Sequence, residues 1–179
     1  GGNTDVPYIY IGMDRAANDS IIEAGFHYIN GNWVAFVNYI KNGVHQWWQS
    51  STAYTAATAD IKITITGTST EIINEVPKTF TDVTFHINGV LQGTFKTDLN
   101  TLTQTALQKR VNTIVGYTSG ASYSQMQWNE FYIYTGGTTW TLWQQSATIT
   151  ATRAYSPTLS KFNTSNLLNY YREYVGINP

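Results

Sequence analysis

Two glutamates stand inside stretches that otherwise have the pattern of aromatic β-strands. Glu23 lies in DSIIEAGFHY, residues 19–28, and Glu130 lies in QWNEFYIY, residues 127–134. Charged residues make up only 12% of the chain, so a carboxylate in either strand needs an explanation. Two carboxylates that share a groove repel each other, which raises the pKa of at least one of them. Such a pair supplies a proton donor and a charged base, as hydrolysis requires. Glu23 and Glu130 are therefore the candidate catalytic pair.

Strand alternation places both glutamates away from the core, because successive side chains of a strand point to opposite faces. Ile22 and Phe26 have the pattern of a core face, and Glu23 and His27 point to the other side. In the second strand the same alternation groups Glu130 with large rings that carry a polar group, namely Trp128, Tyr132 and Tyr134.

Aromatic rings on such a face suit a concave sheet that holds an extended ligand, since they stack on sugars or flank a peptide. Further large rings lie near hairpin turns at Trp33, Trp47 and Trp48. The plain alternative is that the glutamates are solvated strand residues and the aromatics only pack. The candidate ligand-binding residues are Trp128, Tyr132, Tyr134, Trp33, Trp47, Trp48 and His27.

The elements that must position these residues are predicted to be almost entirely β. Apolar and polar residues alternate with a period of two along most of the chain, and Asn-Gly pairs at 30–31, 42–43 and 88–89 predict tight hairpins. About eleven short strands with turn signals predict a two-sheet antiparallel β-sandwich of jelly-roll type, in a single domain over residues 1–179. Helical spacing also predicts short helices near 100–108 and 165–175. The predicted core consists of Ile22, Phe26, Ile61, Ile63, Ile65, Val83, Phe85, Phe131 and Ile133.

Composition argues against several classes of function. The net charge of −1 gives no basic face for nucleic acid, and no apolar run approaches the roughly 20 residues of a membrane-spanning helix. The chain lacks cysteine, its three histidines are scattered, and it has no Gly-rich phosphate loop, so we expect neither a metal site nor a cofactor. The abrupt start GGNTDVP and the wealth of Tyr, Trp, Thr and Asn favour a secreted protein, as a mature fragment without its signal peptide.

Residues 8–28 and 128–134 together resemble segments of the glutamic peptidases, also called eqolisins. Ile11-Gly12-Met13-Asp14 is similar to the family segment that reads approximately Trp-Val-Gly-Ile-Asp, and residues 21–28 are similar to Ile-Leu-Gln-Thr-Gly-Phe-Asp-Trp. WNEFYIY resembles the later family strand Asn-Ala-Glu-Phe-Ile-Ile-Glu, which places Glu130 on the catalytic glutamate. The likeness extends over about residues 8–135.

The resemblance implies a concanavalin-like β-sandwich in which Glu130 activates a water as general base. The family's glutamine amide stabilises the oxyanion, but this chain has Glu23 at that position. An ionised carboxylate offers no hydrogen-bond donor, so only a protonated Glu23 would imitate the amide. The resemblance therefore implies peptidase activity at acidic pH only.

Three functions follow from these observations. The first is a secreted module that binds an extended polymer, an extracellular polysaccharide in preference to an extended peptide, in an aromatic-lined cleft that carries Glu23 and Glu130. The second is a hydrolase that uses this pair on glycosidic or peptide bonds. The third is a non-catalytic protein that interacts through its surface.

Overall fold

The structure is a computed structural model that describes residues 8–103, 106–114, 132–134, 140–142 and 173–176. The chain divides by contacts into two compact units, residues 10–109 and residues 1–9 together with 110–179. The single domain over residues 1–179 stays a prediction.

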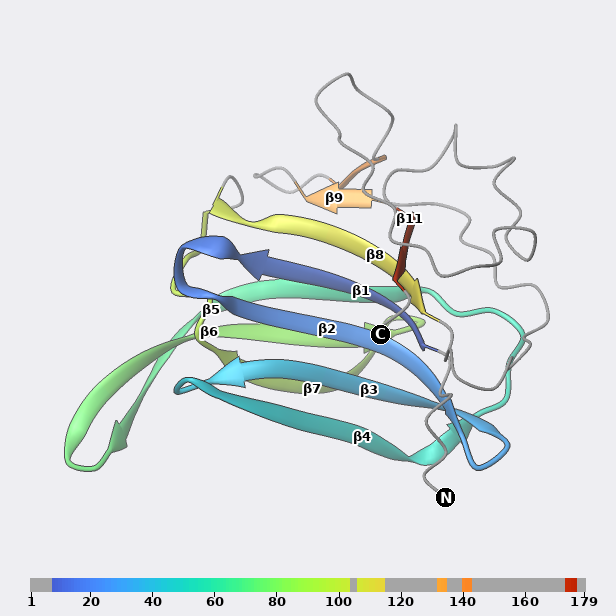
Figure 1. The fold of residues 1–179 in the computed structure, drawn as a ribbon, viewed down its shortest axis with the longest axis horizontal. Helices are drawn as coiled ribbons and strands as arrows, with labels where there is room; N and C mark the ends of the chain where they lie inside the picture. The colour runs from blue at the N-terminus through green and yellow to red at the C-terminus, as the bar shows by residue number, and fades with distance from the viewer. Residues whose placement is uncertain (1–7, 104–105, 115–131, 135–139, 143–172, 177–179) are drawn as a thin grey trace. The chain divides into compact units, whose positions relative to one another are not determined.

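The first sheet of the unit 10–109 has the order β1-β2-β3-β4 (Figure 1). Strands β2, β3 and β4 pair antiparallel, and the short 3-10 helix η1 (Ala16–Asn18) joins β1 to β2. Both predicted Asn-Gly hairpins of this sheet are confirmed, with φ of 51° and 81° at Asn30 and Gly31 and of 53° and 73° at Asn42 and Gly43. The four strands are β1 (Tyr8–Arg15), β2 (Ser20–Ile29), β3 (Asn32–Lys41) and β4 (Val44–Tyr54).

The second sheet consists of three antiparallel strands, β5 (Ile61–Ile73), β6 (Val76–Ile87) and β7 (Val90–Thr97). Strand β7 pairs with Thr81–Ile87 of β6, so the remainder of β5 and β6 continues as a two-stranded arm, at the lower left of Figure 1. The sequence pattern predicts two strands, 60–66 and 70–75, where the structure has β5 alone. The register shifts between Ile65 and Gly67 without ending the pairing, because a bulge absorbs the extra residue.

The two sheets of this unit pack face to face, which confirms the antiparallel β-sandwich. The ring of Phe95 on β7 lies 5.4 Å from that of Tyr39 and 5.7 Å from that of Trp48, both on the first sheet. Burial of one such side chain contributes roughly 1.5–3 kcal/mol. Of the predicted core, four residues are buried as expected: Ile22, Phe26, Val83 and Phe85.

The rest of the predicted core divides into two groups. Ile61, Ile63 and Ile65 are half-buried, because β5 is paired on one side only and lies at the edge of its sheet. Phe131 lies outside the described residues, and Ile133 lies in β9 (Tyr132–Tyr134).

The predicted helix near 100–108 is not formed as an element: residues 101–103 and 107 are not helical, and Ala106 has the 3-10 conformation, with its N–H donating to the carbonyl of Thr103 at 3.2 Å. The carbonyls of Leu99 and Asn100 accept hydrogen bonds from the Arg15 guanidinium, and the backbone N–H of Thr103 donates to Thr101 Oγ1 at 3.0 Å. These bonds take backbone groups that a helix would pair internally. Gln108 then begins strand β8 (Gln108–Ile114).

The predicted helix near 165–175 is wrong at its described end. Strand β11 (Glu173–Gly176) pairs in parallel with β8, with Glu173 opposite Val111. Pairing with a neighbouring strand outweighs the helical spacing of the side chains, and residues 165–172 lie outside the described part.

Strand β9 pairs antiparallel with β10 (Trp140–Leu142). No helix among the described residues has the length and apolar character needed to span a membrane.

Candidate functional site

Glu23 lies in a row of side chains that crosses three strands of the first sheet. Glu23 on β2 is directly opposite Asn38 on β3, and Asn38 is directly opposite Trp47 on β4. Residues opposite each other in antiparallel strands point to the same face. We call this side of the sheet the Glu23 face. Ile22 and Ala24, which alternate with Glu23, are fully buried on the side that packs on the second sheet.

The Glu23 carboxyl is surrounded by polar groups from each neighbouring strand. Asn38 Nδ2 donates a hydrogen bond to Glu23 Oε2 at 3.0 Å, and the Tyr10 hydroxyl of β1 makes a second one. Burial raises the pKa of the Glu23 carboxyl, while these two hydrogen bonds and the charge of His45 counteract the rise only in part. The site therefore holds an acid that keeps its proton to higher pH than an exposed glutamate does.

Beside this carboxyl lies a compact group of rings on the same face. Trp47 stacks on Phe36 with ring centroids 4.9 Å apart and an angle of 10° between the planes. His27 meets both rings edge-on, at 5.5 Å from Phe36 and 5.4 Å from Trp47, and Tyr10 meets Phe36 at 5.8 Å. Phe36 is 1% exposed, whereas Trp47 is 50% exposed, so Trp47 presents a large aromatic surface to solvent.

His27 belongs to the packing of this face. Its side chain is buried, and burial lowers the pKa of the imidazole while a hydrogen bond with Gln49 opposes that shift. Gln49 Oε1 also accepts a hydrogen bond from Trp47 Nε1 at 3.4 Å. Gln49 thus links a buried neutral imidazole to the exposed indole and restricts the orientation of Trp47.

The structure does not bring all predicted aromatics together with Glu23. Trp48 lies on the opposite face, where it packs on Phe95. Trp33 pairs with Tyr28 across the strands at a ring distance of 5.3 Å, also on the face opposite Glu23. Of the residues predicted near β2 to β4, Trp47 and His27 share the face of Glu23.

The second half of the predicted site stays a prediction. Trp128 and Glu130 lie outside the described residues, and Tyr132 and Tyr134 are placed only as parts of the backbone of β9. The pairing of Glu23 with Glu130 stays a prediction with it.

The structure adds residues that the sequence pattern did not single out, foremost Asn38, Tyr10 and His45. The position of the hairpin turns in the sequence could have predicted Asn38 as a neighbour of Glu23. A two-residue loop at 30–31 places Glu23 and Asn38 opposite each other, since each lies seven positions from the loop. The loop at 42–43 places Trp47 opposite Asn38 in the same way.

In chemical terms, the face offers a carboxyl, an amide and a hydroxyl beside an exposed aromatic ring. Such groups exchange hydrogen bonds with hydroxyl or amide groups of a ligand while the ring stacks on its apolar side. Among the residues that the structure describes, no group of three or more His, Cys, Asp or Glu side chains is placed to hold a metal ion.

Comparisons of the chain with protein-family models, with curated proteins and with solved structures found no match. The resemblance to the glutamic peptidases stays a prediction.

Proposed function

We propose that the Glu23 face binds an extended extracellular polymer, a polysaccharide in preference to a peptide, and that the protein is secreted. The row Glu23, Asn38 and Trp47 carries this proposal. It joins a hydrogen-bonded acid and amide to a half-exposed indole on one side of one sheet.

Sugar recognition uses these groups in this combination. An indole stacks on the C–H face of a pyranose, and a carboxyl and an amide together accept from and donate to its hydroxyls. Neighbouring strands lie about 4.8 Å apart, so a sugar on Trp47 keeps its hydroxyls within reach of the adjacent strand. Because Phe36, His27 and Gln49 hold Trp47 from behind, little side-chain freedom is lost on binding.

The test is retention of the protein on a panel of insoluble polysaccharides, followed by titration with oligosaccharides of the retained type. Trp47→Ala is expected to weaken binding about tenfold or more, equivalent to about 1.4 kcal/mol. Glu23→Gln is expected to weaken it less, since a glutamine still accepts and donates. Glu130→Gln is expected to change little.

Tyr28→Ala is the matched control, because Tyr28 is an aromatic residue of the same sheet, 40% exposed, on the opposite face. It is expected to bind as the wild type does. Retention that survives Trp47→Ala, or an equal loss in Tyr28→Ala, would refute the proposal.

A second candidate function is hydrolysis, and the raised pKa of the Glu23 carboxyl favours it. A general acid needs to keep its proton near the working pH. As a retaining glycosidase, the protein would use Glu23 and Glu130 as acid and nucleophile, which requires carboxyl groups about 5–5.5 Å apart. As a peptidase, Glu130 would activate water, and a protonated Glu23 would donate a hydrogen bond to the oxyanion.

Glu23→Gln separates these two reactions in assays on peptides and glycans from about pH 3 to pH 7. A glutamine amide donates at every pH, so a peptidase is expected to extend its activity to neutral pH in this variant. A glycosidase is expected to lose activity, because the amide supplies neither a proton nor a nucleophile. Lack of turnover by the wild type across this range rules out both reactions on the substrates tested and leaves the binding function.

A further inference from the structure

The turn between β3 and β4 is held by a residue that directly follows the last strand of the other sheet. Asp98, which directly follows β7, accepts hydrogen bonds on its two carboxylate oxygens from the backbone N–H groups of Asn42 at 2.8 Å and Gly43 at 2.7 Å. Its own backbone N–H donates to the carbonyl of Ile40 at 2.9 Å. One residue at the end of β7 thus makes three hydrogen bonds to the end of the β3–β4 hairpin.

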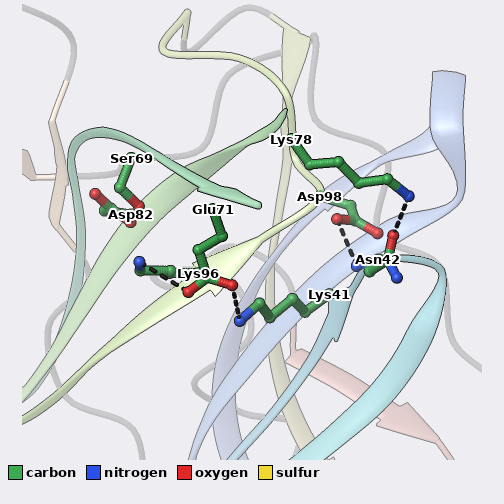
Figure 2. Close-up of polar contacts among 8 residues, drawn as sticks. All are labelled: Lys41, Asn42, Ser69, Glu71, Lys78, Asp82, Lys96 and Asp98. Carbon is green, nitrogen blue, oxygen red and sulfur yellow. Dashed lines mark hydrogen bonds and ion pairs between the residues drawn. The ribbon is translucent and has the colours of Figure 1, made fainter. Parts of the chain in front are cut away.

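Side chains of the second sheet reinforce this attachment (Figure 2). Lys78 of β6 donates to Asn42 Oδ1, so the turn residue is bound from two directions. Next to it, Glu71 of β5 forms ion pairs with Lys41 of β3 at 2.7 Å and with Lys96 of β7 at 2.9 Å. The hairpin end therefore contacts all three strands of the second sheet or their extensions.

The segment that contains Asp98 also holds the β1–β2 connection. Asn18 Nδ2 donates to the carbonyl of Asp98, and the Arg15 guanidinium donates to the carbonyl of Leu99 at 2.8 Å. Leu99 itself is fully buried, which fixes the segment in the sandwich. Both connections at this end of the first sheet are thus attached to one short, anchored segment.

The held hairpin carries Asn38, His45 and Trp47 of the Glu23 site. Asn38 and Trp47 each lie four positions from the Asn42–Gly43 turn, and His45 lies two positions after it. The turn has positive φ at both residues, a conformation that sets the register of the two strands. Because the loop at 30–31 already places Asn38 opposite Glu23, whatever fixes the turn at 42–43 also fixes His45 and Trp47 of β4 relative to Asn38 and Glu23.

We propose that Asp98 is a positioning residue for the Glu23 site: its carboxylate holds the Asn42–Gly43 turn and so places His45 and Trp47 of β4 beside Asn38 and Glu23. The carboxylate suits this role because it accepts two N–H groups at once. An asparagine accepts only one and turns its own N–H₂ group toward the other. This inference deepens the proposed binding function and rests on it only for the binding measurement.

The experiment compares Asp98→Asn with Asp82→Asn in the full chain. Asp82 is the matched control, since its carboxylate also accepts a hydrogen bond within the second sheet, from Ser69 Oγ at 2.7 Å, but does not contact the β3–β4 turn. Amide hydrogen exchange of residues 42–47 reports on the turn. The carbon-13 shift of the Glu23 carboxyl, followed against pH, reports on the site, and oligosaccharide titration reports on binding.

Asp98→Asn is expected to accelerate exchange of the turn amides about tenfold, since hydrogen bonds to a charged group are lost. The titration midpoint of Glu23 is expected to rise, because His45, which the turn positions, lowers it in the wild type. Binding is expected to weaken several-fold. Asp82→Asn is expected to leave all three measurements as in the wild type.

An unchanged Glu23 midpoint in Asp98→Asn, or an equal change in Asp82→Asn, would overturn the positioning role. A shifted midpoint without detectable sugar binding by any form would support this role and defeat the proposed function. If Asp98→Asn does not fold, Lys78→Met replaces it, because it removes only the contact with Asn42 Oδ1. A smaller shift in the same direction supports the proposal, and no shift refutes it.

Discussion

Glu23 and Glu71 are both glutamates inside β-strands of the same sandwich, yet their surroundings have opposite effects on them. Burial on the Glu23 face raises the pKa of Glu23, against which Asn38, Tyr10 and His45 act only in part. On the arm, hydrogen bonds and charge from Lys41 and Lys96 lower the pKa of Glu71. The residue type is the same, and the neighbouring groups determine whether the folded chain favours the protonated or the ionised carboxyl.

Glu23 is the residue at which this protein departs from the arrangement that favours stability alone. A half-exposed acid between two lysines is stabilised in its charged form, and such an ion pair contributes modestly to stability. A partly buried acid that is hydrogen-bonded by an amide and a hydroxyl is destabilising when it ionises. Groups with a pKa shifted by burial are concentrated at functional sites, which is why Glu23, and not Glu71, carries the proposed function.

The largest expected effect is a loss of stability when the buried phenylalanine of either region is replaced by alanine. Phe36 lies under Trp47 on the Glu23 face, and Phe80 lies under the ammonium group of Lys41 at 5.2 Å. Both are nearly fully buried, so Phe36→Ala and Phe80→Ala are each expected to lower the free energy of unfolding by about 3–5 kcal/mol. Urea denaturation at constant pH measures this loss.

The titration midpoint of Glu23, measured in the same two variants, distinguishes the two regions. Only Phe36→Ala is expected to lower the titration midpoint of Glu23 toward that of an exposed glutamate, since Tyr10 contacts Phe36 and water gains access to the carboxyl. An equal change of the Glu23 midpoint in Phe80→Ala would show that the two regions are not independent.

An intermediate effect is expected from Glu23→Gln on the pH dependence of stability. The pKa of Glu23 is higher in the folded than in the unfolded chain, so the folded chain binds more protons between the two values. The contribution of Glu23 to stability is therefore complete below the ordinary glutamate pKa of 4.5 and is lost as the pH rises through the folded value. Glu23→Gln is expected to remove this decline and to be the more stable form at neutral pH.

Urea denaturation at a series of pH values, with wild type and variant in the same buffers, checks this expectation. A variant curve that stays parallel to the wild-type curve above pH 4.5 would mean that Glu23 ionises as readily in the folded chain as in the unfolded one.

Much of the fold was predictable from local features. The Asn-Gly pairs at 30–31, 42–43 and 88–89 do form the turns, and alternation identifies the buried side of β2 and β6. Turn positions also imply the register, which places Glu23 opposite Asn38. The turn at Asn74 and Glu75, both with positive φ, lacks the Asn-Gly signal and was not predicted.

What the sequence pattern could not supply depends on contacts between distant segments. The Asn-Gly pair at 30–31 places Trp33 near a turn, but alternation does not show which face of β3 and β4 packs on the partner sheet. The sequence pattern therefore groups Trp33 and Trp48 with Glu23, although both lie on the opposite face. The segment after β7 has helical spacing, yet Arg15, more than eighty positions earlier, takes its carbonyls. Local spacing in the sequence does not predict that Asp98 lies beside Asn42. It does not predict that two lysines surround Glu71 either.

The smallest expected effect is that of Glu71→Gln, and it completes the contrast with Glu23. Because Lys41 and Lys96 lower the folded pKa of Glu71, its contribution is present above the ordinary value of 4.5 and is lost as the pH falls through the folded value. Glu71→Gln is expected to cause a slight loss of stability at neutral pH that disappears below the folded pKa and in high salt, where exposed pairs are screened. Thermal unfolding at low and high salt measures it. A loss that persists undiminished in high salt would mean that Glu71 acts through packing of the arm, and the opposition between the two glutamates would then not be electrostatic.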